Sequence, residues 1–200
     1  MKKLFVLLTI LLAATAAPAL ASPTIGDPAP DFKVTGASGK TVSLSDYKGK
    51  IVVLEWTSDE CPFVHKWYDS GEMQKLQKKA KEDGVVWLSV DSSSPSNPGY
   101  LDAAGAAGWL KKTQSDPADF LIDEKGEVGH LYDAKTTPNM FVIDKEGKLA
   151  YAGAIDSIAT PDAKDIPKAT NYVEDAIEAL KAGKTVAVAT TRSYGCGVKY

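Results

Sequence analysis

The chain has only two cysteines, one arginine and no run of basic residues. The two cysteines, Cys61 and Cys196, are too few for the framework of a small disulfide-dense protein. Because no basic run is present to follow a phosphate backbone, we expect no nucleic-acid partner. After the first residues, no stretch is long enough to span a membrane, and there is no internal repeat or long low-complexity segment. These absences favour a soluble protein of one domain.

Residues 1–21 have the pattern of a secretory signal peptide. Lys2 and Lys3 precede an apolar run, and Ala19-Leu20-Ala21 forms a small-residue cleavage site. Because Ser22 rather than a cysteine follows this site, we expect no membrane anchor after cleavage. Removing 21 of the 200 residues leaves 179, with 21 Lys and Arg against 26 Asp and Glu, a net charge of −5. We predict an exported protein, either periplasmic or extracellular.

Apolar runs that alternate with helical patterns predict an α/β sheet. Residues 51–56 and 85–90 are apolar almost throughout, which is typical of strands covered on both faces. The helical pattern between them, 61–83, is interrupted at Gly71, where a kink or a second helix capped by Asp69 or Ser70 is expected. The other expected elements are a hairpin within 26–44, helices over 100–112, 127–134 and 171–180, a strand over 120–122, and paired strands over 140–143 and 149–152.

Cys61 lies where the first of these strands turns into the helical pattern. A helix N-terminus presents unpaired N–H groups and the positive end of the helix dipole, and both stabilise the reactive thiolate. Pro62 suits the first helical turn, where its missing N–H costs nothing. The neighbouring carboxylates of Asp59 and Glu60 act in the opposite direction. We predict that Cys61 is a nucleophile, and the alternative is a small buried core residue.

The order βαβ followed by ββα, with a thiol at the first strand-to-helix turn and Thr137-Pro138 before the last hairpin, resembles the thioredoxin fold. Residues 26–32 and 42–50 are similar to the redoxin group that includes peroxiredoxins of the AhpC/TSA type. The resemblance implies a central mixed sheet flanked by helices, with an N-terminal hairpin. It also implies a cis Pro138 opposite Cys61, where a trans turn proline is the alternative, and a chemistry that needs no organic cofactor.

This resemblance covers residues 24–183, so we predict a thioredoxin-like domain over 22–183 and a C-terminal tail over 184–200. Cys196 lies in this tail between two glycines, a context that suits a mobile thiol able to resolve an oxidised Cys61. The alternative is a static disulfide that pins the tail to the domain.

The sequence departs from the patterns of thioredoxins and peroxiredoxins at several positions. Val64 stands where a thioredoxin-type dithiol has its second cysteine, so a local dithiol cycle is excluded. Leu54 replaces the proline that peroxiredoxins carry seven residues before their cysteine, whereas Ser58 retains a hydroxyl at the third residue before it. Peroxiredoxins also hold the thiolate with an arginine, and here the one arginine is Arg192, in the tail.

Two enzymatic hypotheses follow from these residues. In the first, an exported thiol-disulfide oxidoreductase uses Cys61 as nucleophile and Cys196 as resolving thiol, with protein or small-molecule thiols and disulfides as partners. In the second, a thiol peroxidase forms a sulfenic acid on Cys61, assisted by the Ser58 hydroxyl. Cys196 then condenses with it, and a thioredoxin-like donor reduces the disulfide. Pro138 belongs to the candidate site in both.

Two further hypotheses involve no catalysis. His65 follows Cys61 by four residues, so that a thiolate and an imidazole on adjacent helical turns would suit Cu(I), with Cys196 as a third ligand. The same imidazole would act as a base in a thiol enzyme, and the alternative is a solvated surface histidine. Finally, a catalytically silent domain with a structural Cys61–Cys196 bond fits the cysteine count. His130 has no motif around it, and we assign it no role.

Overall fold

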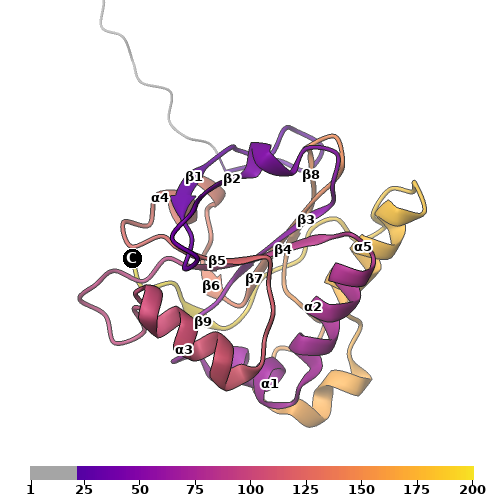
Figure 1. The fold of residues 1–200 in the computed structure, drawn as a ribbon. Helices are drawn as coiled ribbons and strands as arrows, with labels where there is room; N and C mark the ends of the chain where they lie inside the picture. Colours follow the sequence, from indigo (N-terminus) through magenta and orange to yellow (C-terminus); the bar gives the residue numbers. More distant parts are fainter. Residues whose placement is uncertain (1–21) are drawn as a thin grey trace, which may run out of the picture.

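The computed structural model describes residues 22–200, so the predicted signal peptide and its cleavage site lie outside the described residues. Within this part of the chain, no helix has the length and apolar character needed to cross a membrane. The described residues form a central sheet with helices packed against it, and the predicted mixed α/β architecture is confirmed (Figure 1).

The central sheet has five strands in the order β5-β4-β3-β7-β8. Strands β3, β4 and β5 run parallel, as expected when helices connect them, whereas β7 is antiparallel to β3 and β8 is antiparallel to β7. Strand β3, which precedes Cys61, therefore lies in the middle of the sheet. The strand bounds are β3 Val52–Trp56, β4 Val86–Asp91, β5 Asp119–Ile122, β7 Asn139–Ile143 and β8 Leu149–Gly153.

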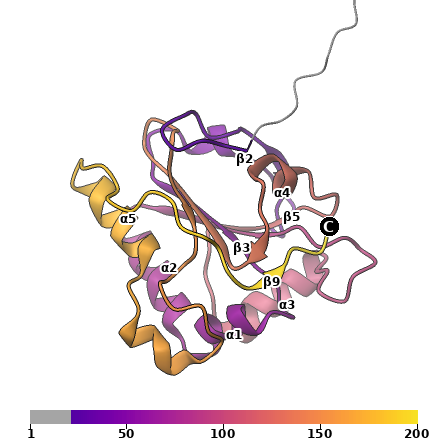
Figure 2. The same ribbon diagram turned by 180° about the vertical axis from the view of Figure 1, so that it is seen from behind.

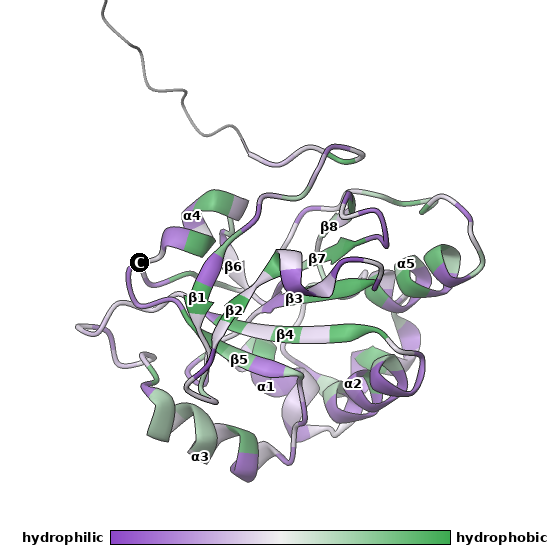
Figure 3. Ribbon diagram, turned by 45° about the horizontal axis from the view of Figure 1, so that its top comes forward, coloured by the Kyte–Doolittle hydropathy of each residue, from purple (hydrophilic) through white to green (hydrophobic). Residues whose placement is uncertain are grey.

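Both faces of this sheet are buried, which explains the continuous apolar runs in its strands. Side chains alternate along β3, so that Val53 faces one core and Leu54 the other. The first core lies under α1, α2, α3 and α5 (Pro62–Asp69, Glu72–Glu82, Ala103–Thr113 and Tyr172–Lys181). The second core is covered by α4 (Glu127–Tyr132) and by the N-terminal hairpin of β1 and β2 (Lys33–Thr35 and Thr41–Ser43). Figure 3 shows the apolar colouring of the strands between these layers.

The helical pattern after Cys61 forms two helices, α1 and α2, rather than one kinked helix. Gly71 occupies the N-cap of α2 with a φ of +79°, a left-handed conformation that glycine adopts without steric cost. The expected caps Asp69 and Ser70 are therefore wrong, because both still belong to the end of α1. The Ser70 hydroxyl donates backward to the Trp67 carbonyl at 3.0 Å, and its oxygen accepts from Glu72 N, the first residue of α2, at 3.4 Å.

The tail follows α5, crosses the molecule and ends near α4 (Figure 2). It first pairs with the edge of the sheet, where Ala152 bonds with Ala189 and Thr191 at 3.1 Å each. It then forms β9 (Cys196–Gly197), which pairs antiparallel with β6 (Thr136–Thr137). These two-residue strands were not predicted, and neither were the 3-10 helices Leu44–Tyr47 and Ala163–Lys168. The tail is thus docked through these two pairings.

Candidate active site

Cys61 occupies the N-cap of α1, directly after the loop that leaves β3. Its backbone is extended, with φ −94° and ψ 116°, and its carbonyl accepts the first helical hydrogen bonds, from Val64 N at 3.0 Å and His65 N at 2.9 Å. Pro62 follows in the first turn, as predicted. The Cys61 thiol is only 1% exposed and donates a hydrogen bond to the Thr137 carbonyl at 2.9 Å. The nucleophile candidate is therefore positioned at a helix start but covered.

The Thr137-Pro138 peptide bond is cis, which confirms the expectation for Pro138. Thr137 belongs to β6, and its carbonyl oxygen faces the thiol of Cys61. The proline segment thus lies directly against the cysteine at the N-terminus of α1.

Cys196 lies beside the same segment, in the strand β9 that pairs with β6. It is the partner of Thr137 in the pairing of β9 with β6, and both cysteines are free thiols. Burial, the hydrogen bond with the Cys61 thiol and the charge of the Cys61 thiolate together raise the pKa of Cys196 to about 11, and burial is the largest of these causes. Two cysteines separated by 134 intervening residues in the sequence are therefore neighbours in space. In the folded protein the tail holds Cys196 in strand β9, where it pairs with Thr137.

Removing the Cys61 thiol is expected to lower the pKa of Cys196 from about 11 toward its ordinary value of 9. In Cys61→Ala the hydrogen bond and the thiolate charge are gone, while burial, the largest cause, still keeps the pKa above 9. Ultraviolet titration of the thiolate measures this directly, because the variant has one remaining thiol. An unchanged pKa of about 11 would show that the two thiols do not interact.

The Ser58 hydroxyl bonds within its own loop. Its oxygen accepts from Glu60 N at 3.4 Å and lies close to Gly99, where an added Cβ would approach it to 3.0 Å. The Ser58 carbonyl accepts from Cys61 N at 3.3 Å. Ser58 therefore supports the backbone of Cys61, and its hydroxyl makes no hydrogen bond to the thiol.

His65 does not join Cys61, although four residues separate them. Its Nε2 donates to the Asp59 carbonyl at 2.7 Å and its Nδ1 lies 3.1 Å from the Asp69 carboxylate, so both ring nitrogens are engaged. Cys61 is an extended N-cap residue, and for this reason helical spacing does not place its side chain under that of His65. Within residues 22–200, no group of three or more His, Cys, Asp or Glu side chains has the arrangement of a metal site. The copper site of Cys61, His65 and Cys196 is not assembled.

Comparison with known proteins shows the family to which the chain belongs. The sequence model of the AhpC/TSA family matches residues 25–152, more than half of the chain. The chain belongs to the AhpC/TSA family. It is 38% identical over 68 residues to the thiol-disulfide oxidoreductase ResA of Bacillus thuringiensis, and 38% identical over 58 residues to glutathione peroxidase 1 of Caenorhabditis elegans. These matches cover 34% and 29% of the chain, and only 38% and 34% of the two relatives.

Solved structures place the chain among thioredoxin-like folds. A hypothetical protein of Sinorhizobium meliloti superposes with a TM-score of 0.75 at 22% identity, over 90% of this chain and 96% of the other. An uncharacterized conserved protein of Geobacillus kaustophilus gives 0.76 at 24% identity, over 88% and 92%. A Chlorobium tepidum protein provisionally assigned as the thiol:disulfide interchange protein DsbE gives 0.53 at 28% identity, over 66% and 85%. The two solved structures that cover most of this chain thus share its fold.

The arginine of this AhpC/TSA-family chain lies outside the thiol site. Arg192 is exposed and lines a cavity of about 610 Å³ together with Thr136, Tyr194 and Gly195. Within the described residues it makes no hydrogen bond to Cys61 or Cys196. The tail does fold back over the domain, but it brings Cys196 rather than Arg192 to Cys61.

A fully buried carboxyl group, Glu55, lies six residues before Cys61 and was missed by the sequence analysis. It accepts hydrogen bonds from Trp87 Nε1 at 2.7 Å, Tyr68 OH at 2.9 Å and Ser89 Oγ at 3.1 Å. Burial raises the pKa of Glu55 to about 7, against the lowering effect of these donors. Its signal in the sequence was a single charged residue inside the apolar run 51–56.

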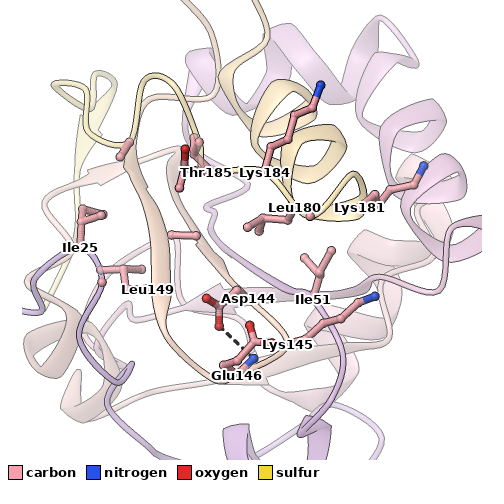
Figure 4. A pocket seen from close by; sticks show the side chains of 15 residues that line it. Ile25, Ile51, Asp144, Lys145, Glu146, Leu149, Leu180, Lys181, Lys184 and Thr185 are labelled. Carbon is pink, nitrogen blue, oxygen red and sulfur yellow. Dashed lines mark hydrogen bonds between the residues drawn. The ribbon is translucent and has the colours of Figure 1, made fainter.

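The hollow shown in Figure 4, of about 520 Å³, lies at the other end of β3, beside Ile51. Leu180 and Ile51 point toward it, while the ammonium groups of Lys181 and Lys184 point away. It contains no thiol, and its lining includes none of the residues around Cys61.

Proposed function

We propose that this chain is a thiol-disulfide oxidoreductase in which Cys61 is the nucleophile and Cys196 the resolving thiol. The observation that carries the proposal is the juxtaposition of the two free thiols at β6, next to the cis Pro138. We further propose a thioredoxin-like domain over 22–183 with a functional tail over 184–200, exported by the predicted signal peptide. Partners would be protein or small-molecule thiols and disulfides.

The chemistry proceeds by two displacements. The Cys61 thiolate attacks one sulfur of a substrate disulfide, forming a mixed disulfide and releasing one substrate thiolate. The Cys196 thiolate then attacks the Cys61 sulfur, forming the Cys61–Cys196 disulfide and releasing the second substrate thiolate. The substrate gains two electrons from the protein dithiol, and the two thiol protons pass to the two substrate thiolates.

The raised pKa of Cys196 supports this order of steps. At neutral pH, burial and the neighbouring Cys61 keep the proton on Cys196, so the first attack is assigned to Cys61. Once Cys61 is in a mixed disulfide its thiolate charge is gone, and that contribution to the raised pKa of Cys196 disappears. Formation of the first bond therefore favours ionisation of the thiol that makes the second.

A thiol peroxidase is the second candidate, favoured by the 38% identity to glutathione peroxidase 1 over 58 residues. In it, Cys61 is oxidised to a sulfenic acid by a peroxide that leaves as an alcohol or water. Cys196 then condenses with the sulfenic acid, with loss of water, and an external thiol donor reduces the resulting disulfide.

Stopped-flow oxidation of the reduced protein distinguishes the two candidates. Tryptophan fluorescence and free-thiol counts would be followed after mixing with oxidised glutathione or with hydrogen peroxide. For the oxidoreductase we expect rapid loss of both thiols with oxidised glutathione, none in Cys61→Ser, and a stable glutathione adduct on Cys61 in Cys196→Ser. Faster reaction with peroxide, and a trapped sulfenic acid in Cys196→Ser, would instead establish the peroxidase. Absence of both reactions would refute both candidates.

A further inference from the structure

A fully buried ion pair ties α1, the helix capped by Cys61, to a distant part of the chain, because its lysine, Lys66, belongs to α1. Lys66 Nζ donates to Asp156 Oδ2 at 2.8 Å, and neither side chain has any exposed surface. Lys66 also donates to the Ile158 carbonyl at 3.0 Å, and Ile158 N donates to Asp156 Oδ1 at 2.8 Å. Charges removed from water in this way need every donor and acceptor to be satisfied.

The remaining partner of this ion pair comes from the tail. The Tyr194 hydroxyl donates to Asp156 Oδ1 at 2.5 Å, and its oxygen lies 3.5 Å from Lys66 Nζ. The Tyr194 ring lies edge-on to Phe63 at 5.8 Å and 5.7 Å from the Lys66 ammonium. Phe63 and Lys66 both belong to α1, whereas Tyr194 precedes Cys196 by two residues. One cluster thus joins the helix of the nucleophile to the tail of the second thiol.

The segment between Tyr194 and Cys196 leaves little freedom to the tail. Gly195 has a φ of +136°, and a Cβ at this position would overlap the carbonyl oxygen of Thr137. That carbonyl is the one to which the Cys61 thiol donates. Gly195 therefore brings the tail backbone against the cis-proline segment immediately before Cys196.

We propose that Lys66, Asp156 and Tyr194 form a latch. The latch holds the tail over Cys61 and keeps Cys196 next to Cys61, and Tyr194 acts in it as a positioning residue. The proposal rests on the proposed function, because it concerns the disulfide of that same site. A closed latch has two consequences. Tyr194 and Cys196 pack against the core cluster that contains Cys61, which is 1% exposed, and the effective concentration of the Cys196 thiol at Cys61 is high.

The Tyr194 hydroxyl is the part of the latch that a mild substitution can remove. A hydrogen bond to a carboxylate is about twice as strong as a neutral one. Tyr194→Phe keeps the ring contacts with Phe63 and Lys66 but leaves the Asp156 carboxylate one donor short. The tail is then held less tightly, while the ion pair inside the domain keeps its other partners.

The first test measures the disulfide equilibrium in glutathione buffers, in which protein disulfide and two glutathiones give protein dithiol and oxidised glutathione. Tyr194→Phe is expected to make the disulfide about tenfold less stable, a change of about 30 mV in reduction potential. Tyr132→Phe is the matched control, because it removes another tyrosine hydroxyl from the interior, one that donates to the Pro30 carbonyl at 2.7 Å, in the other core. The control is expected to leave the potential unchanged.

The second test does not need the disulfide. In the Cys196→Ser background, alkylation of Cys61 by iodoacetamide is expected to be about tenfold faster with Tyr194→Phe, and unchanged with Tyr132→Phe. If the wild type forms no Cys61–Cys196 disulfide but this acceleration is seen, the proposed function fails and the latch stands. If the disulfide forms, and Tyr194→Phe changes neither its stability nor the alkylation rate, the latch is overturned and the proposed function stands.

Discussion

Replacing Lys66 with methionine is expected to lower the free energy of unfolding by about 3–5 kcal/mol. Methionine matches the length of the lysine stem, so packing is largely kept, but the Asp156 carboxylate loses its buried counter-ion at 2.8 Å. An uncompensated charge in the interior costs much more than the pair itself contributes. Urea unfolding followed by tryptophan fluorescence measures the loss.

Two further variants separate the buried charge from a general effect of removing a lysine. Lys81→Met breaks an equally close pair with Asp116, at 2.6 Å, but these side chains are 69% and 75% exposed. We expect a loss of at most about 1 kcal/mol there. The double variant Lys66→Met with Asp156→Leu removes both buried charges and is expected to regain most of the stability. Equal losses from Lys66→Met and Lys81→Met would contradict the account of a buried pair.

The parts of the site that sequence reasoning placed correctly are local. The position of Cys61 follows from an apolar strand, a turn and Pro62, all within twelve residues, and local signals are read directly from the chain. The cis Pro138 came from resemblance alone, because nothing around Thr137-Pro138 distinguishes a cis from a trans bond.

The parts that sequence reasoning missed depend on contacts between distant segments. Lys66 and Asp156 are 90 residues apart, and the residues around each of them in the sequence do not indicate that the lysine is buried. The pairing of Cys196 with Thr137 involves two-residue strands, too short for any alternation to be seen. The hypothesis that His65 joins Cys61 does not hold, because the imidazole is held by the Asp59 carbonyl, a backbone group whose position only the folded loop defines.

In the proposed mechanism, the order of events at the two thiols follows from how the tail is held. Cys61 is 1% exposed in the dithiol form, so we propose that an external disulfide reaches it when the tail moves, whereas the proposed resolving step needs the tail in place. A latch made of a few hydrogen bonds suits both demands, because local opening of a docked segment costs far less than global unfolding. Access of a substrate to Cys61 and resolution of the mixed disulfide by Cys196 would then both depend on this one segment.

Glu55→Gln is expected to abolish a pH dependence of the free energy of unfolding. In the wild type this free energy falls by about 3 kcal/mol between about pH 4.5 and pH 7 because of Glu55. Burial raises the pKa of Glu55 from 4.5 to about 7, so the folded protein retains a proton that the unfolded chain has lost. The free energy of unfolding therefore falls as the pH rises through this window and stays at the lower level above it. A glutamine cannot ionise, so the free energy of unfolding of the Glu55→Gln variant lacks this contribution.

The amide also fits the hydrogen bonds around Glu55. Its oxygen can accept from Trp87 and Ser89, while its NH₂ group donates to the Tyr68 oxygen. Urea unfolding at pH 4.5, 6 and 8 would be compared between the two proteins, because other titrating groups cancel in the difference. With Glu82→Gln, which changes an exposed carboxylate, the difference from the wild type should not vary with pH in this way. If the difference for Glu55→Gln were also constant from pH 4.5 to 8, Glu55 would not hold a proton in the folded protein.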